Sequence, residues 1–230
     1  MIILEVKNLR VTVQDQTILE NVSFSIEKGE TLAVIGPNGS GKTTLFRAIL
    51  GARPFEGEII KEKGIRIGYV PQKVDLERDI PITVEEFLTL RNHPGKDQDH
   101  SPKNVLKLVG LAPDYLNKKI GELSSGELQR IFIAWAIIGH PELLLFDEPT
   151  ASVDIAGQGT VYELLHKLQD EQNLALILIS HDLSVVYRYA NKVLCLNKGQ
   201  VCFGPPAEVL TPGELQKLYG GEQKLYHHLH

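Results

Sequence analysis

The sequence lacks any hydrophobic segment long enough to cross a membrane. Its longest apolar runs lie at 131–138 and 174–179, and both are much shorter than the ~20 residues that a spanning helix needs. The N-terminal segment carries Glu5 and Lys7 inside its apolar stretch, so it does not have the layout of a secretory signal peptide. We therefore expect any role at a membrane to be exercised from the cytosol, through partner proteins.

Cysteine is scarce, since the chain contains only Cys195 and Cys202. The two residues flank an Asn-Lys-Gly sequence that is typical of a hairpin turn. If Leu196 faces Gln200 across this turn, Cys195 faces Val201, and the two thiols are not direct partners. We therefore expect both cysteines to be small apolar strand residues of a reduced cytosolic protein, with neither a disulfide nor a metal between them.

An excess of basic residues is also missing. The 24 Lys and Arg residues against 29 Asp and Glu residues give a formal net charge of -5 and a pI near 5.9. A nucleic-acid-binding protein usually has a basic face, so the charge argues against that class. The 230 residues, 43% hydrophobic and 23% charged, instead predict a globular protein with one large domain, or one domain with an insertion.

The apolar patterns predict an α/β fold with a mostly parallel sheet. Alternating patterns at 3–6 and 22–26 indicate antiparallel strands. A continuous apolar run at 31–35 is typical of a buried central strand, and a helix follows at about 42–50. Later strands are predicted at 143–146, at 174–179 and near 193 and 201, and later helices at 156–169 and 183–189. Strands that alternate with helices imply a parallel sheet covered on both faces.

The segment 82–139 has a different pattern. Apolar positions recur at helical spacing, and the polar stretch at 92–102 contains the loop-forming pair Pro94 and Gly95. We interpret 82–139 as a helical insertion into a single domain. The α/β core and its antiparallel β subdomain are then formed by 1–81 and 140–220, and 221–230 is a tail.

Residues 36–43 fit the phosphate-binding pattern G-x-x-x-x-G-K-[ST]. Glycines let backbone N–H groups surround phosphate oxygens, and the following helix directs its positive N-terminus at the same anion. Lys42 is expected to reach the β- and γ-phosphates, and the Thr43 hydroxyl to bind Mg²⁺. The strand before and the helix after argue against a chance glycine turn. The predicted nucleotide-binding residues here are Gly36, Pro37, Asn38, Gly39, Ser40, Gly41, Lys42, Thr43 and Thr44.

Residues 143–148 predict a buried strand that ends in two acids. Ligands of open α/β sheets bind at the carboxyl ends of the strands. Asp147 is therefore placed to hold Mg²⁺, directly or through a water, opposite Thr43. Glu148 is the candidate general base that orients the attacking water. Two solvated acids at a strand end are the alternative, which the phosphate-binding pattern disfavours.

Ser124 and Glu127 fit a capping box at the start of a helix that runs through 131–138. With Gly126 beside them, this helix N-terminus could also bind an anion. Taken alone, the motif is better explained as a helix cap and nothing more.

The sequence resembles the nucleotide-binding domains of ABC transporters over nearly all of its length. The matching pieces occur in the family's order: the phosphate loop at 36–44, Gln72 of the Q-loop, the signature at 123–127, Asp147 and Glu148, the D-loop at 151–154 and the switch histidine His181. The resemblance implies a P-loop NTPase core with an N-terminal antiparallel β subdomain and an inserted α-helical subdomain. It also implies an ATPase with ATP and Mg²⁺ as cofactors.

The resemblance further implies a head-to-tail dimer with two ATP molecules at the interface. Ser124 and Gly126 would contact the γ-phosphate of the nucleotide held by the second copy, and Asp154 would lie at the same nucleotide. His181 would touch that phosphate and help position the water. Gln72 would bind near Mg²⁺ and report its occupancy to the helical insertion, where membrane permease subunits would dock. A location at the cytoplasmic face of the cell membrane follows.

Two features depart from the usual pattern of that family. The usual signature is Leu-Ser-Gly-Gly-Gln, whereas Ser125 and Glu127 replace a glycine and the glutamine here. A carboxylate at 127 is expected to weaken the contact with a phosphate. The aromatic residue that stacks on adenine in the family corresponds to Val13, and no aromatic residue precedes Phe24.

The downstream half is most similar to the ATPases of zinc and manganese uptake systems. The stretches that carry this resemblance are 121–123, 127–130, 153–158, 180–183 and 193–197, with Gly204. It implies import of a divalent transition metal by a homodimeric motor, with an extracytoplasmic solute-binding protein as an indirect partner.

Two other classes were weighed against a transporter subunit. A soluble ABC ATPase that acts on DNA or ribosomes is disfavoured, because the chain has no coiled-coil or zinc insertion. A small-molecule kinase is disfavoured by the signature and by His181. At the C-terminus, His227, His228 and His230 could ligate Zn²⁺, but a solvated terminus is the interpretation that we favour.

Overall fold

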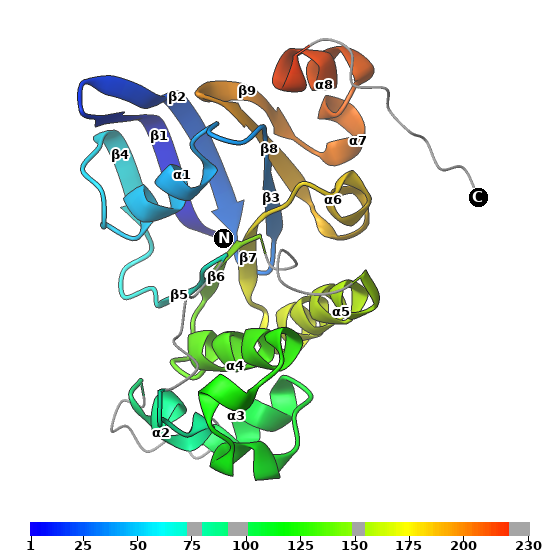
Figure 1. Ribbon diagram of the computed structural model, residues 1–230. Helices are drawn as coiled ribbons and strands as arrows, with labels where there is room; N and C mark the ends of the chain where they lie inside the picture. Colours follow the sequence, from blue (N-terminus) through cyan, green and yellow to red (C-terminus); the bar gives the residue numbers. More distant parts are fainter. Residues whose placement is uncertain (73–79, 92–100, 149–154, 221–230) are drawn as a thin grey trace. The chain divides into compact units, whose positions relative to one another are not determined.

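The computed structural model describes residues 1–72, 80–91, 101–148 and 155–220 (Figure 1). Its contacts divide the chain into two compact units. The first unit comprises 1–3, 27–30 and 61–179, and the second comprises 4–26, 31–60 and 180–230. No helix in the described ranges is both long and apolar enough to cross a membrane.

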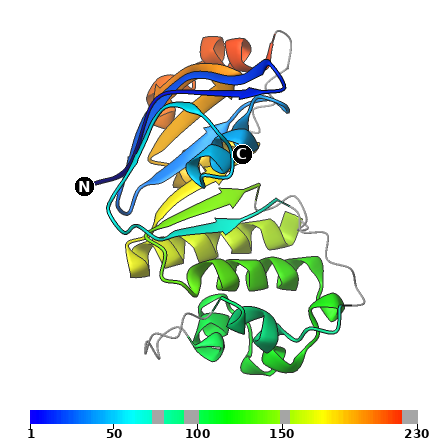
Figure 2. The same ribbon diagram turned by 90° about the vertical axis from the view of Figure 1, so that its left-hand side faces the viewer.

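The first unit contains a parallel sheet with the strand order β7-β6-β5. Its strands are β5 (Ile67–Val70), β6 (Leu143–Asp147) and β7 (Ala175–Ile179). Every residue of β6 and β7 is buried, as expected for parallel strands covered by helices. Helices α4 (Ser125–Ile137) and α5 (Ile155–Gln172) lie on one face of this sheet (Figures 1 and 2).

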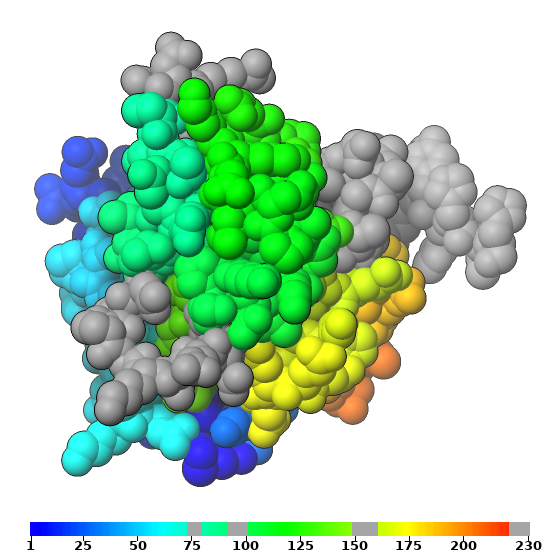
Figure 3. All heavy atoms as spheres, turned by 90° about the horizontal axis from the view of Figure 1, so that it is seen from below, coloured from blue at the N-terminus to red at the C-terminus, as the bar shows by residue number. Residues whose placement is uncertain are grey.

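A layer of short helices packs on the far side of α4 (Figure 2). It consists of α2 (Val84–Thr89), α3 (Pro102–Leu108), and the 3-10 helices η2 (Pro113–Asn117) and η3 (Ile120–Glu122). The guanidinium of Arg91 lies 4.4 Å from the ring centroid of Trp135 and joins the end of α2 to α4. From outside, 80–91 and 101–137 form one continuous surface (Figure 3). The predicted helical character of 82–139 is confirmed for the described residues, while its boundaries as a subdomain stay a prediction.

The second unit contains strands in the order β4-β1-β2-β9-β8-β3. The long strands β1 (Ile2–Val13) and β2 (Gln16–Glu27) are joined by Gln14 and Asp15, with φ of 48° and 62°. Positive φ at both central residues defines the turn that connects antiparallel strands of a hairpin. The other strands are β3 (Thr31–Ile35), β4 (Glu56–Lys61), β8 (Lys192–Asn197) and β9 (Gly199–Gly204). β3 pairs with β8 in parallel. The predicted combination of antiparallel N-terminal strands and parallel core strands is confirmed.

The described residues of the second unit form the helices α1 (Lys42–Ile49), α6 (Leu183–Tyr189), α7 (Pro206–Val209) and α8 (Pro212–Tyr219). Helices α7 and α8 contact the β8–β9 hairpin (Figure 1). The Nδ2 of Asn197 donates to the carbonyl oxygen of Leu218 at 3.2 Å and fixes α8 at the turn of that hairpin.

The expectation for the two cysteines is wrong, because Cys195 and Cys202 form a disulfide. Leu196 does face Gln200, as assumed, but the register shifts between Cys195 and Leu196. This β-bulge leaves Val201 without a direct partner and places Cys202 opposite Cys195. Their Cα atoms are 4.8 Å apart, a distance that a disulfide can span. A regular two-residue alternation does not foresee such a bulge.

Candidate nucleotide-binding and catalytic site

The phosphate-binding pattern forms the loop between β3 and α1. The backbone has φ of 153° at Gly36, 78° at Gly39 and 99° at Gly41. A Cβ at Gly36 would lie 2.0 Å from the carbonyl oxygen of Leu196, and one at Gly41 would lie 2.4 Å from the Cδ2 of Leu19. Both glycines are therefore required by backbone conformation and by close packing.

Lys42 folds back over this loop. Its Nζ donates to the carbonyl oxygens of Gly36 at 2.9 Å and of Pro37 at 3.0 Å, and the residue is buried. Helix α1 begins after Gly41 without a side-chain cap and has no acid in its first turn. The uncapped first turn of α1 and the ammonium of Lys42 thus form a positive pole that suits a phosphate.

Ser40 adds a second feature that fits an anion. Its Oγ is buried and has no hydrogen-bond partner among the described residues, although buried hydroxyls are usually paired. The loop residues therefore fit a polyphosphate. Thr43 and Thr44 follow in the first turn of α1, where both are half-buried, so the Thr43 hydroxyl is an oxygen donor of the kind that Mg²⁺ takes.

The carboxyl end of β6 in the first unit carries the two predicted acids. Asp147 is 2% exposed, and the hydroxyl of Tyr69 donates to its Oδ2 at 3.5 Å. Glu148 has a φ of 48°, which is uncommon outside glycine and is frequent at functional sites. The Nε2 of Gln72 donates to its Oε2. The structure thus brings Gln72, Asp147 and Glu148 to one end of β5 and β6.

The helix start predicted at Ser124 is confirmed. Ser124 caps α4: its Oγ accepts from the backbone N–H of Glu127 at 3.3 Å and donates to the Oε2 of Glu127 at 2.8 Å. The backbone N–H of Ser124 donates to the same Oε2 at 2.8 Å. This is a complete capping box. It fixes the local geometry and leaves the role of Ser124 toward a nucleotide as a prediction.

For Gly126, in the first turn of α4, the described part of the chain gives no packing reason to be glycine. An added Cβ there would meet nothing within 4 Å, and its φ lies outside the left-handed region. A helical glycine costs ~1 kcal/mol relative to alanine in a helix interior. Glycine at such a position is explained if another molecule approaches the backbone closely.

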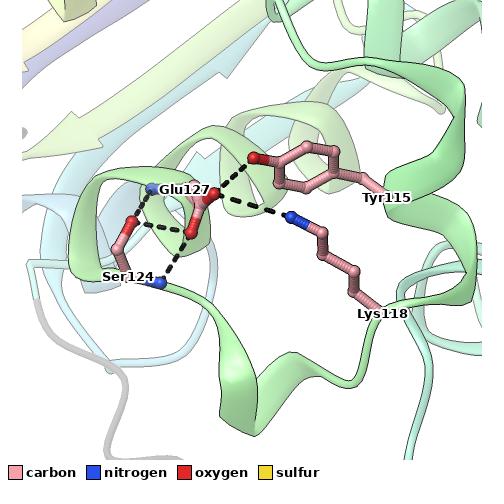
Figure 4. Close-up of polar contacts among 4 residues, drawn as sticks. All are labelled: Tyr115, Lys118, Ser124 and Glu127. Carbon is pink, nitrogen blue, oxygen red and sulfur yellow. Dashed lines mark hydrogen bonds and ion pairs between the residues drawn. The ribbon is translucent and has the colours of Figure 1, made fainter.

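Two residues that the sequence motifs do not include surround Glu127 (Figure 4). The hydroxyl of Tyr115 donates to its Oε1, and the Nζ of Lys118 lies 3.9 Å from the same oxygen. Lys118 also lies 3.4 Å from the ring centroid of Tyr115. The hydrogen bond from Tyr115, followed by those from Ser124, lowers the pKa of Glu127 to about 2. The carboxylate is therefore ionised and held on both oxygens.

The remaining predicted residues are distributed as follows. His181 is exposed in the second unit and precedes Asp182, whose Oδ1 accepts from the backbone N–H of Ser184 and caps α6. Val13 is the half-buried last residue of β1. Asp154, with the D-loop at 151–154, and the histidines of the tail lie outside the described residues.

The predicted site residues fall in two sets. The second unit holds the phosphate loop and His181, and the first unit holds the other five that lie in the described residues, Gln72, Ser124, Gly126, Asp147 and Glu148. In the first unit, one hydrogen bond joins Gln72 to Glu148. Tyr69, Tyr115 and Lys118 were missed by sequence analysis, since no local pattern marks them. Tyr69 lies opposite Leu145 on β6, and the pairing of β5 with β6 would have been needed to find it.

Comparison with known protein families decides the assignment. The family model for ABC transporters matches residues 19–151. The chain belongs to the ABC transporter family. Because ATP-binding proteins of this family hydrolyse ATP, the chain is an ABC ATPase, and the fold class predicted from the sequence is confirmed.

Several relatives cover most of the ABC ATPase sequence. A protein of Thermotoga maritima named "Probable metal transport system ATP-binding protein" is 40% identical over 95% of this chain and 91% of its own. The zinc import ATP-binding protein ZnuC of Wigglesworthia glossinidia brevipalpis is 39% identical over 99% of both chains. The ZnuC of Haemophilus influenzae is 37% identical over 96% of this chain and 81% of its own.

Solved structures agree with the family. A transporter described as of the metal-chelate ABC type, in an inward-facing conformation, matches with a TM-score of 0.82 and 31% identity. The match covers 95% of this chain and 89% of the other. An ATP-binding cassette of an ABC transporter in the ADP conformation matches with a TM-score of 0.80 and 25% identity, over 96% of this chain and 100% of the other.

Proposed function

We propose that this ABC ATPase is the motor subunit of a transporter that imports a divalent transition metal, zinc or manganese, through a separate membrane permease. The names of its relatives support metal transport, since they include zinc import ATP-binding proteins and a metal transport system protein. A soluble ABC ATPase that acts on DNA or ribosomes is the alternative, and neither the relatives nor the net charge of -5 favours it.

The phosphate loop is the observation that carries the ATPase mechanism. The β- and γ-phosphates of ATP take the pole formed by Lys42 and the open N-terminus of α1. Thr43, Gln72 and Asp147 supply oxygen ligands for Mg²⁺, which offsets the phosphate charge when it is bound. These donors fit the ion, because a buried carboxylate and a hydroxyl are ligands that Mg²⁺ prefers.

Glu148 acts as general base in this proposal. It accepts a proton from the water that attacks the γ-phosphate, and its hydrogen bond with Gln72 orients the carboxylate. His181 contacts the γ-phosphate and positions the same water. Asp154 lies at the same nucleotide through the D-loop.

A second copy of the chain completes the site. Two chains bind head to tail around two ATP molecules, and Ser124 and Gly126 of one chain contact the γ-phosphate bound by the other. The surroundings of Gly126 support this arrangement. Among the described residues, no atom lies within 4 Å of the position that a Cβ would occupy, so a phosphate has room to approach the backbone.

The membrane partner docks beside Gln72 and the helical insertion at 82–139. In the sequence, this insertion lies between the core segments 1–81 and 140–220. The ATPase is then a peripheral protein of the cytoplasmic face of the cell membrane. An extracytoplasmic solute-binding protein delivers the metal to the permease without touching this chain.

Metal uptake by the reconstituted transporter tests the proposal. The chain and its permease, placed in vesicles that enclose MgATP and carry the metal-loaded solute-binding protein outside, should accumulate zinc or manganese, and vesicles with the Glu148→Gln chain should not. ATP-driven uptake of neither metal would contradict the cargo. ATP hydrolysis that is stimulated by DNA or ribosomes, with no binding to the permease, would favour the alternative.

A further inference from the structure

The carboxylate of Glu127 competes for the hydroxyl of Ser124. That hydroxyl has one proton, and in the structure it is donated to the Oε2 of Glu127 at 2.8 Å. A Ser124 that contacts a phosphate has to turn this proton away from Glu127. The negative charge of Glu127 also lies in the same helical turn as Ser124 and Gly126, where it disfavours a second anion.

Tyr115 and Lys118 oppose both effects. They approach Glu127 from the side opposite Ser124 and bind the other carboxylate oxygen, Oε1 (Figure 4). The ammonium of Lys118 offsets the charge of the carboxylate. Because Oε1 is bound in this way and Oε2 still accepts from the backbone N–H of Ser124 at 2.8 Å, the carboxylate stays satisfied when the Ser124 hydroxyl leaves it.

We propose that Tyr115 and Lys118 are positioning residues of the signature: Tyr115 holds the Glu127 carboxylate, Lys118 offsets its charge, and together they free the Ser124 hydroxyl for the γ-phosphate of ATP bound to the second copy. The inference rests on the proposed function, in which Ser124 touches that nucleotide. It assigns to Glu127 the role of a charged helix cap whose charge is balanced within the chain.

If Lys118 only stabilised the fold, its loss would lower the thermal unfolding midpoint. We expect otherwise. The side chains of Lys118 and Glu127 are 40% and 28% exposed, and ion pairs of such exposure contribute little to stability. Loss of Lys118 should therefore hardly change the thermal unfolding midpoint. If its role is electrostatic, however, its loss should matter only while residue 127 carries a charge.

ATP-driven dimerisation measures the effect directly. In the full-length Glu148→Gln chain, which retains bound ATP, we would measure the ATP concentration for half-maximal dimerisation by light scattering after gel filtration. Lys118→Met should raise it on the order of 3- to 10-fold at low ionic strength and less at high ionic strength. Lys118→Arg, which keeps the charge, should restore it to within about 2-fold. Tyr115→Phe should act in the same direction as Lys118→Met.

The decisive comparison places Lys118→Met in a Glu127→Gln background. With no charge at 127, the substitution should change the half-maximal ATP concentration by less than about 2-fold. An equal effect in both backgrounds, or no effect in either, would overturn the inference. Ser124→Ala distinguishes failure of the proposed function from failure of this inference. Normal dimerisation of Ser124→Ala would contradict the proposed contact of Ser124 with the nucleotide. Impaired dimerisation of Ser124→Ala, together with normal dimerisation of Lys118→Met, would contradict only the positioning role.

Discussion

Gly126→Ala should stabilise the chain and impair it as an ATPase at the same time. The structure indicates that the substitution raises the free energy of unfolding. The new Cβ meets no atom within 4 Å and needs no left-handed backbone, and alanine is favoured over glycine by ~1 kcal/mol in a helix interior. Since Gly126 lies in the first turn of α4, we expect about half of that, ~0.5 kcal/mol, in the free energy of unfolding.

The second effect depends on the second copy. If the backbone at Gly126 approaches the γ-phosphate, a methyl group there obstructs the approach, and dimerisation with ATP should weaken by on the order of 10-fold or more. Urea unfolding of the full chain without nucleotide measures the stability. Gel filtration with MgATP, performed in the Glu148→Gln background, measures the dimer.

Gly213→Ala is a matched control. Gly213 occupies the equivalent place in α8, after a Thr211 cap whose Oγ1 accepts from the backbone N–H of Glu214 at 3.2 Å. An added Cβ at Gly213 would lie 4.0 Å from that Oγ1, an ordinary contact. The control should gain similar stability and dimerise normally. The reasoning is refuted if Gly126→Ala destabilises the chain, or if it dimerises as well as the control.

Three further predictions follow from the site and the hairpin. Glu148→Gln should reduce ATP hydrolysis by ~10²-fold or more while the ATP-bound dimer persists; near-normal turnover in a phosphate-release assay would contradict the role of general base. The Cys195–Cys202 disulfide closes a short loop with a sequence separation of 7, so its reduction should lower the free energy of unfolding by about 2–3 kcal/mol in urea titrations. The unfolding of a Cys195→Ala, Cys202→Ala double variant should not respond to reductant. Val13→Tyr should tighten ATP binding by ~1 kcal/mol through stacking on adenine, with no gain for inorganic triphosphate; equal titration curves for both proteins would show that Val13 does not face the base.

The sequence predicts best those elements that are buried on all sides. Strands β3, β6 and β7 are buried along their whole length, so each leaves a continuous apolar run, and their positions match the predicted ones within a residue or two. Helix α6 coincides with the prediction at 183–189. The physical reason is that complete burial tolerates few polar residues, and the pattern survives in the sequence.

The strands β1, β2, β8 and β9 of the second unit are predicted less well. The expected strands at 3–6 and 22–26 are parts of strands that extend over 2–13 and 16–27. Asn8 and Asn21 have φ of 48° and 52° inside these strands, and such irregularities interrupt the alternation on which the prediction depends. The register shift that pairs the cysteines is an error of the same kind, because a single extra residue reverses which side chains face each other.

The candidate site divides in a similar way. The phosphate loop and the helix cap at Ser124 depend on local backbone geometry, so a short pattern in the sequence predicts them. Tyr69, Tyr115 and Lys118 act from other elements, and their contacts depend on how those elements pack. The left-handed backbone of Glu148 is likewise set by its surroundings, since nothing in the residue type demands it.

Glu127 shows why a departure from a family pattern cannot be judged from the motif alone. In the sequence, a carboxylate within a phosphate-binding turn predicts a weaker contact. In the structure, it completes a capping box and is balanced by Lys118 at 3.9 Å. A neutral glutamine at 127 could accept from Tyr115 or from the Ser124 backbone but not from both, because these donors bind different oxygens of Glu127 and one of the two positions becomes an NH2 group. It would also leave Lys118 without its anion. Residues 118 and 127 are therefore expected to act as one electrostatic unit, so the effect of either on the signature depends on the charge of the other.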